Sequence, residues 1–128
     1  MKVLLDTQAF LWLIGDTPEL SKQARKIFLD PHNKLYLSLA SIWEIAIKNS
    51  LGKLKLRHPI ERFIPEQLQE NGILQLDINF RHVARVATLP FHHRDPFDRL
   101  IISQAMEESL PILSTDSAFD DYDLKRIW

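Results

Sequence analysis

Met1-Lys-Val-Leu-Leu-Asp-Thr7 is the stretch of sequence that decides the fold. Its unbroken apolar run, Val3 to Leu5, is too short for a helix and is typical of a strand buried on both faces. Such strands lie in the middle of a parallel sheet that helices cover on both sides. The run ends at Asp6, and open α/β sheets bind their ligands outside the carboxyl ends of the strands. Asp6 is therefore the first candidate for a functional residue.

Length and composition indicate one globular domain, residues 1–128, which would bury roughly two thirds of its unfolded surface. The hydrophobic fraction is 45%, which is typical of a folded rather than a disordered chain. Without cysteine, the chain forms neither disulfides nor thiolate metal sites. The net charge of −1 argues against non-specific electrostatic binding of nucleic acid and leaves a local basic patch open. No apolar run approaches the length of a membrane span, so we expect a cytoplasmic protein with no membrane partner.

Short apolar runs alternate with helical patterns along the rest of the chain. Further strands are expected at 35–37, 73–76, 111–114 and 124–128, the last of them at a sheet edge. Helices are expected at 8–15, 20–28, from Ser38 or Ser41 to 51, 80–88 and 96–109, and Pro59 and Pro65 predict two further short helices. Strands separated by helices within one domain predict a three-layer α/β/α sandwich with a mainly parallel central sheet.

The helix expected at 8–15 carries five consecutive large apolar residues, Phe10 to Ile14. These residues cannot all face one core. Either the helix packs on several sides, or part of it, such as Trp12, is covered by another protein chain.

Three further acids are expected close to Asp6. Asp116 ends an apolar strand in the same way as Asp6, and parallel strands that end alike place both carboxylates at one edge of the sheet. Asp98 occupies the third position of a helix for which Asp95 has the features of an N-cap. Glu44 lies within an apolar helix face, where a carboxylate is unexpected unless a contact or a function accounts for it.

Each acid also has a plain structural explanation, and Asp6 could do little beyond ending its strand. Asp98 can complement the positive end of its helix, and Asp116 can cap the turn that follows it. Glu44 can form a capping box with Ser41 and an i, i+4 pair with Lys48. Converging carboxylates, however, repel one another unless a cation lies between them. Oxygen-only ligation favours Mg²⁺ or Mn²⁺, and the absence of a histidine at any predicted strand end argues against histidine ligands.

Three phrases of the sequence resemble one known family. They are Leu4-Leu-Asp-Thr-Gln-Ala-Phe-Leu-Trp12, Ser41-Ile-Trp-Glu-Ile-Ala-Ile-Lys-Asn-Ser-Leu-Gly-Lys-Leu54 and His93-Arg-Asp-Pro-Phe-Asp-Arg-Leu-Ile-Ile102. In this order they resemble the PIN-domain ribonucleases, and within them the VapC-type toxins of bacterial toxin–antitoxin pairs. The resemblance extends from Val3 to Trp128, and three phrases in the right order make it specific.

The resemblance implies a metal site with one or two Mg²⁺ or Mn²⁺ ions. By position, Asp6 and Asp98 would be direct ligands, and Asp116 would complete the site. Glu44 would bind a second metal or orient a water. The four residues would together be the catalytic acids of the site.

Other residues around the implied site have supporting roles. Thr7 and Ser114 would hold the acids by hydrogen bonds. The loop His92-His93-Arg94 is a candidate to face the phosphate, with Arg94 as the substrate contact, although it also fits a solvated polar loop. Gln8 stands where similar toxins often have His, and Ser103 where Ala is usual, but neither replaces a carboxylate.

The implied activity is metal-assisted hydrolysis of RNA phosphodiesters by the toxin of a toxin–antitoxin pair. The implied partners are an RNA substrate, a cognate antitoxin that docks on Phe10–Ile14 and covers the metal site, and a second copy of the chain. In such a homodimer the two acidic sites would face a shared groove.

Other functions fit the sequence less well. A haloacid-dehalogenase-like phosphatase has its general acid two residues after the first Asp, where this chain has Gln8. A response-regulator receiver domain has a Lys at a late strand end, which Ser114-Thr-Asp116 does not offer. The alternative is a non-catalytic PIN-like interaction module. The presence of all four acids argues against it.

Overall fold

A fully parallel sheet of five strands forms the centre of the computed structural model, which describes residues 1–128. The strands are β1 (Lys2–Leu5), β2 (Lys34–Ser38), β3 (Ile73–Leu76), β4 (Ile112–Leu113) and β5 (Arg126–Ile127). They lie side by side in the order β3-β2-β1-β4-β5, and every neighbouring pair is parallel. The opening stretch of the chain is therefore the central strand, and the last strand lies at an edge, as the sequence predicts.

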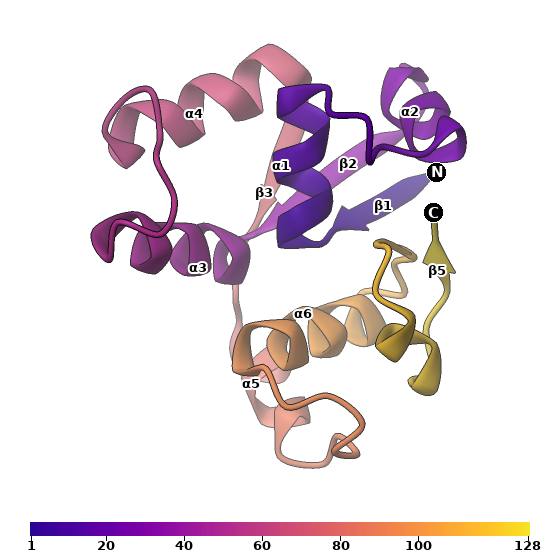
Figure 1. Ribbon diagram of the computed structural model, residues 1–128. Coiled ribbons are helices and arrows are strands. Elements are labelled where there is room, and N and C mark those ends of the chain that lie inside the picture. Colours follow the sequence, from indigo (N-terminus) through magenta and orange to yellow (C-terminus); the bar gives the residue numbers. More distant parts are fainter.

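Helices cover both faces of this sheet, which confirms the predicted three-layer α/β/α fold. The helices are α1 (Thr7–Gly15), α2 (Lys22–Leu29), α3 (Leu39–Ser50), α4 (Ile60–Asn71), α5 (Phe80–Val86) and α6 (Pro96–Glu107). Figure 1 shows α1, α2 and α4 on one side of the sheet and α5 and α6 on the other. Helix α3 contacts both α1 and α6. None of these helices combines the length and the apolar character needed to cross a membrane.

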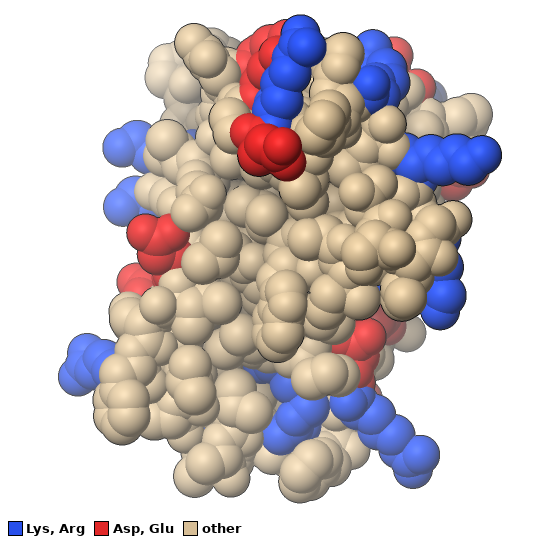
Figure 2. Space-filling model, turned by 90° about the vertical axis from the view of Figure 1, so that its left-hand side faces the viewer, with Lys and Arg blue, Asp and Glu red and all other residues tan.

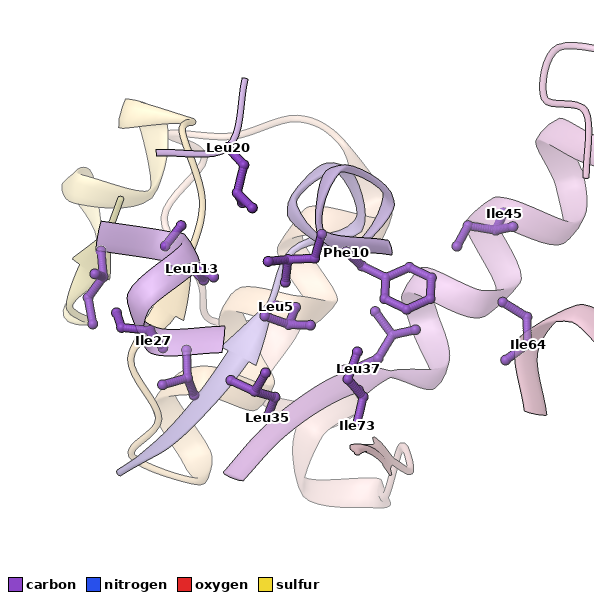
Figure 3. Packing of buried hydrophobic residues seen from close by; sticks show 14 of the residues in the cluster. Leu5, Phe10, Leu20, Ile27, Leu35, Leu37, Ile45, Ile64, Ile73 and Leu113 are labelled. Atoms are coloured by element: carbon purple, nitrogen blue, oxygen red, sulfur yellow. The ribbon is translucent and has the colours of Figure 1, made fainter. Parts of the chain in front are cut away.

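Alternate residues of β1 supply two separate hydrophobic clusters. Val3 and Leu5 belong to the cluster beneath α1, α2 and α4, whereas Leu4 belongs to the cluster beneath α6. All three side chains are fully buried, as expected for a central strand. Figure 3 shows the Phe10 ring of α1 extending toward Leu37 of β2, within the larger cluster.

The apolar run in α1 is divided between the core and a half-buried face. Phe10 and Leu13 are buried, and Leu11, Trp12 and Ile14 are half-buried. The Trp12 ring packs against that of Trp128, with 5.6 Å between the ring centroids, so part of its cover comes from its own chain. The helix ends at Gly15 as predicted, but the left-handed residue is Asp16, with φ at 47°.

Residues 60–71 form one helix, so the prediction of two short helices was wrong. Pro65 lies inside α4 and does not break it. A proline removes one backbone hydrogen bond and crowds the preceding turn. Its neighbours Phe63 and Ile64 are buried in the larger cluster, and we infer that this packing keeps the helix continuous. The predicted end of the helix at Gly72 is correct, with φ at 63°.

Ser38 links β2, α3 and α6. It is the N-cap of α3, which excludes Ser41 from that position, and its Oγ accepts a hydrogen bond from the Ala40 N–H at 2.9 Å. The same hydroxyl donates to Oε1 of Gln104 on α6, and both side chains are fully buried. One hydroxyl therefore fixes the start of α3 relative to α6, the two helices that carry Glu44 and Asp98.

Ser38→Ala should destabilise the protein more than Ser21→Ala. Ser21 caps α2 through a single bond to the Ala24 N–H, and its loss should cost about 1 kcal/mol. Loss of Ser38 also leaves the buried Gln104 carbonyl without a donor, which should bring the total to about 2–4 kcal/mol. Urea denaturation of both variants measures the difference. Equal losses would show that the Ser38–Gln104 bond contributes nothing to stability.

Candidate metal centre

The carboxyl edge of the sheet gathers all four predicted acids. Asp6 follows β1, Glu44 lies on α3, Asp98 lies in the first turn of α6, and Asp116 follows β4. All four line one pocket of about 170 Å³. The elements that carry them are separate in sequence, and the parallel topology brings their carboxyl ends or helix N-termini to the same edge.

Asp6 is the most enclosed of the aspartates in this pocket. It caps α1 by accepting the Ala9 N–H at 2.6 Å through Oδ1, and the Ser114 hydroxyl donates to Oδ2. Burial raises the pKa of Asp6, and the Asp116 and Glu44 carboxylates add to this effect, while the two hydrogen bonds oppose it. Ser114 thus makes the supporting contact that the sequence predicts.

Glu44 is held by contacts from two helices. The Thr7 hydroxyl donates to Oε1 at 2.7 Å, which is the supporting contact predicted for Thr7. Lys48 approaches Oε2 at 2.9 Å, and this hydrogen bond raises the pKa of Lys48. The predicted i, i+4 pair is therefore present. The capping box with Ser41 is not, because Ser38 occupies the N-cap position of α3.

Asp98 carries the largest perturbation in the pocket. Desolvation raises the pKa of its carboxyl to about 7, with further contributions from the Asp95, Glu44 and Asp6 carboxylates and an opposing one from His93. Asp95 accepts the N–H groups of Phe97 and Asp98 at 2.8 and 3.1 Å, so it is the N-cap of α6 as predicted.

His93 is the site residue whose place the sequence argument missed. Its Nε2 lies 3.0 Å from Oδ2 of Asp98 and 3.1 Å from Oδ2 of Asp116. The sequence prediction considered His93 only as part of a phosphate-facing loop and argued against histidine ligands. The available signal was its position two residues before the N-cap of α6, which brings it to the sheet edge where that helix begins.

Two cations near the site differ in their placement. Lys48 lines the acidic pocket, whereas the Arg94 side chain is exposed and does not line it. The sequence proposed Arg94 as the substrate contact and treated Lys48 only as a structural partner of Glu44.

The donor set fits a hard divalent cation. Four carboxylates share a small pocket, and one carboxylate oxygen each from Asp98 and Asp116 lie within 4.8 Å of one another. The pKa values of Asp6 and Asp98 are raised because their ionised carboxylates are destabilised first by burial and then by the neighbouring carboxylates. A cation among them would relieve this repulsion, and carboxylate oxygens are the ligands that Mg²⁺ and Mn²⁺ prefer.

Asp98→Asn should stabilise the metal-free protein increasingly as pH rises from about 4 to about 7, and the gain should level off above about pH 8. The pKa of Asp98 is raised to about 7 in the folded state. Proton binding by Asp98 therefore adds to the free energy of unfolding in full at pH values below the pKa of the unfolded chain, and this contribution is lost as pH rises through the pKa of the folded chain. After allowance for solvent screening, the gain at about pH 8 should be roughly 1–3 kcal/mol. Urea denaturation in EDTA at a series of pH values measures it. A gain that does not depend on pH would contradict the electrostatic origin.

Comparison with known proteins identifies the family. The model of the PIN domain family matches residues 3–125. Ribonuclease VapC16 from Mycobacterium tuberculosis (strain ATCC 25618 / H37Rv) is 37% identical over 62 residues, which are 48% of this chain and 44% of that protein. The match therefore spans less than half of the length of VapC16.

Solved structures share the fold over the whole chain. The VapBC2 structure from Rickettsia felis, bound to a promoter DNA fragment, aligns with 100% of this chain and 99% of its own at 17% identity and a TM-score of 0.75. The DNA-bound VapBC structure from Salmonella typhimurium aligns with 99% of this chain and 97% of its own, at 16% identity and a TM-score of 0.69. With the family match across almost all of its length, this chain belongs to the PIN-domain family.

Proposed function

We propose that this chain is a Mg²⁺- or Mn²⁺-dependent endoribonuclease and the toxin of a toxin–antitoxin pair. The observation that carries the proposal is the convergence of four carboxylates in one pocket of a PIN-family chain. The partial match to a protein named ribonuclease VapC16 supports RNA as the substrate. We propose that residues 1–128 act as a single domain in the cytoplasm.

The carboxylates would divide the work of the site. Asp6, Asp98 and Asp116 would hold the first ion, and Glu44 would bind a second ion or orient a water. One or two such ions would neutralise the scissile phosphate and lower the pKa of an attacking water. The hydrogen bond from Ser114 fixes the orientation of Asp6 before substrate arrives.

Cations of the chain would receive the RNA backbone at this negative site. Lys48 lines the pocket and has a half-exposed side chain, so its ammonium group can move from Glu44 to a phosphate oxygen. Arg94, exposed on the loop before α6, would provide a second phosphate contact. Both contacts are electrostatic and should weaken as salt is raised.

A groove beside the acidic pocket supports an antitoxin partner. The groove has a volume of about 590 Å³ and is lined by Leu11 and Ile14 of α1, Phe63 of α4, and basic residues that include Arg57. Gln8 and Leu11 line both the groove and the acidic pocket. A partner segment with apolar and acidic side chains could therefore fill the groove and reach the acids. The solved neighbours described as VapBC structures support such a partner.

A second copy of the chain is the occupant that we propose for the face of α3. Figure 2 shows the side of the molecule that carries α3 and α4, with uncharged atoms across its middle and charged side chains around them. Trp43 of α3 is 57% exposed, and its ring meets that of Phe97 edge to face at 4.9 Å between the ring centroids. These aromatics adjoin Glu44 and Asp98 in sequence, so a dimer on this face would bring two acidic sites toward a shared groove.

Trp43→Glu should shift the protein toward monomer, because a charge placed in an apolar interface must be desolvated. We expect the dimer dissociation constant to rise at least about tenfold in analytical ultracentrifugation. Phe80→Glu is the matched control, since Phe80 is also an exposed aromatic residue, at 84%, but lies on another helix, α5. Dissociation by the Phe80 variant alone would place the interface on α5 instead.

The purified protein should cleave RNA with Mg²⁺ or Mn²⁺ and lose this activity in EDTA. Asp98→Asn should reduce the cleavage rate at least about a hundredfold, because it removes one anionic ligand. Asp120→Asn is the control, since Asp120 pairs with Arg126 outside the pocket. Equal activity of the parent and the Asp98 variant would reject the assigned site. An inactive parent across a broad RNA panel would favour the non-catalytic interaction module.

A further inference from the structure

The ring of His93 lies between two of the proposed metal ligands without being placed to act as a ligand itself. We propose that His93 is a positioning residue whose Nε2–H donates to Asp116 beside Asp98 and so holds the two carboxylates in one geometry. The inference rests on the proposed function only in taking these two carboxylates as metal ligands. It makes His93 a hydrogen-bond donor, whereas its closeness to the two acids would suggest that it is a third metal ligand.

The protonation of the ring follows from its other nitrogen. Nδ1 of His93 accepts a hydrogen bond from the backbone N–H of Asp95 at 3.2 Å. A backbone amide can only donate, so Nδ1 offers its lone pair and the ring proton belongs on Nε2. That proton is donated to Oδ2 of Asp116, which lies 3.1 Å from Nε2. Oδ2 of Asp98 lies 3.0 Å from the same nitrogen.

Direct metal ligation would require the opposite tautomer. A ligand nitrogen must present its lone pair to the ion, so ligation through Nε2 would move the ring proton to Nδ1. There it would meet the N–H of Asp95, which is fixed because Asp95 is the N-cap of α6. Two donors would then face each other, and the hydrogen bond at Nδ1 would be lost.

The backbone around His93 holds the ring in this position. The His93 N–H donates to the Tyr122 hydroxyl at 2.9 Å, and this hydroxyl donates to the Pro90 carbonyl at 2.7 Å. On its other side, the His93 carbonyl accepts from the Arg99 guanidinium at 3.3 Å. The ring itself lies near that of Phe119, with 5.9 Å between centroids. His93 is thus fixed at its N–H, its carbonyl and its side chain.

Arg99 organises the whole loop that carries His93. Its guanidinium is buried and donates to four carbonyl oxygens, those of Val86, Leu89, Pro90 and His93. It also lies over the exposed Phe91 ring at 4.2 Å. Because Arg99 directly follows Asp98 on α6, the loop is attached to the helix that supplies one of the two carboxylates.

The position of His93 leaves the carboxylates of Asp98 and Asp116 able to bind a cation. Asp116 uses Oδ1 to cap the turn that follows it, through the Ala118 N–H at 2.9 Å, and uses Oδ2 for His93. Asp98 contacts His93 through Oδ2, so its Oδ1 remains available. A carboxylate oxygen carries two lone pairs and can accept a hydrogen bond while it binds a metal.

Nitrogen NMR of the histidine rings tests the tautomer directly. Long-range proton–nitrogen spectra of ¹⁵N-histidine protein would be recorded without metal and with Mg²⁺, and His93→Asn would assign the His93 signals. We expect Nε2 to carry the proton in both states. A proton on Nδ1 in the metal-free protein, or its transfer to Nδ1 when Mg²⁺ is added, would overturn the inference.

Metal affinity tests the positioning role separately. Mn²⁺ binding followed by electron paramagnetic resonance should weaken at least about tenfold in His93→Ala. It should recover to within about threefold in His93→Gln, whose amide N–H can replace the Nε2 donor. Equal affinity of all three proteins would reject the role, as would a glutamine variant no better than alanine. Circular dichroism and urea denaturation establish that the variants are folded.

These measurements separate the inference from the proposed ribonuclease activity. Neither uses RNA, so a protein that binds Mn²⁺ but cuts no RNA would reject the proposed reaction while the His93 results stand. A protein that cuts RNA and shows a Nδ1 proton on His93 would support the reaction and reject the inference. A protein that binds neither Mg²⁺ nor Mn²⁺ would reject both the metal site and the positioning role.

Discussion

Repulsion among carboxylates gathered at one end of the sheet is the constraint on which the rest of the structure depends. Each acid is held there by a hydrogen-bond donor or a cation. Ser114 donates to Asp6, Lys48 and Thr7 engage Glu44, and His93 lies between the remaining two. Helix N-termini add partial positive charge at the same edge. Hydrogen bonds, cations and helix N-termini thus offset the repulsion among the four carboxylates, which apolar packing alone would not do.

The local parts of this arrangement can be predicted from sequence. The run from Val3 to Leu5 is buried on both faces, as its composition indicates. Successive residues of a strand point to opposite faces, so three consecutive apolar side chains are buried only where helices cover both faces of the sheet. Asp98 follows from helix-capping chemistry within four residues, since Asp95 and Pro96 mark where α6 begins. Parallel topology then makes strand ends and helix starts coincide, so Asp6, Asp98 and Asp116 could be grouped from the sequence. Glu44 lies in the second turn of α3, because that helix begins at Leu39 and not after Ser41.

The remaining parts depend on contacts between distant segments. No local pattern could reveal that Trp128 covers Trp12 or that the serine at the end of β2 binds a glutamine on α6. The failure at Pro65 has the same origin, since burial of neighbouring side chains outweighs a local helix-breaking tendency. His93 was missed because its position depends on carbonyl oxygens that Arg99 gathers from residues as far as 13 positions away. Polar contacts of this kind carry no periodicity.

The double use of Asp6 bears on how the protein would evolve. Its carboxylate caps α1 and also faces the acidic pocket, so replacement by most residues would weaken folding and function together. Asp98 is different, because its charge opposes folding and its side chain caps nothing. In a lineage relaxed from selection for activity, substitutions at Asp98 would therefore be retained as folded, silent variants. Substitutions at Asp6 would be lost through degradation.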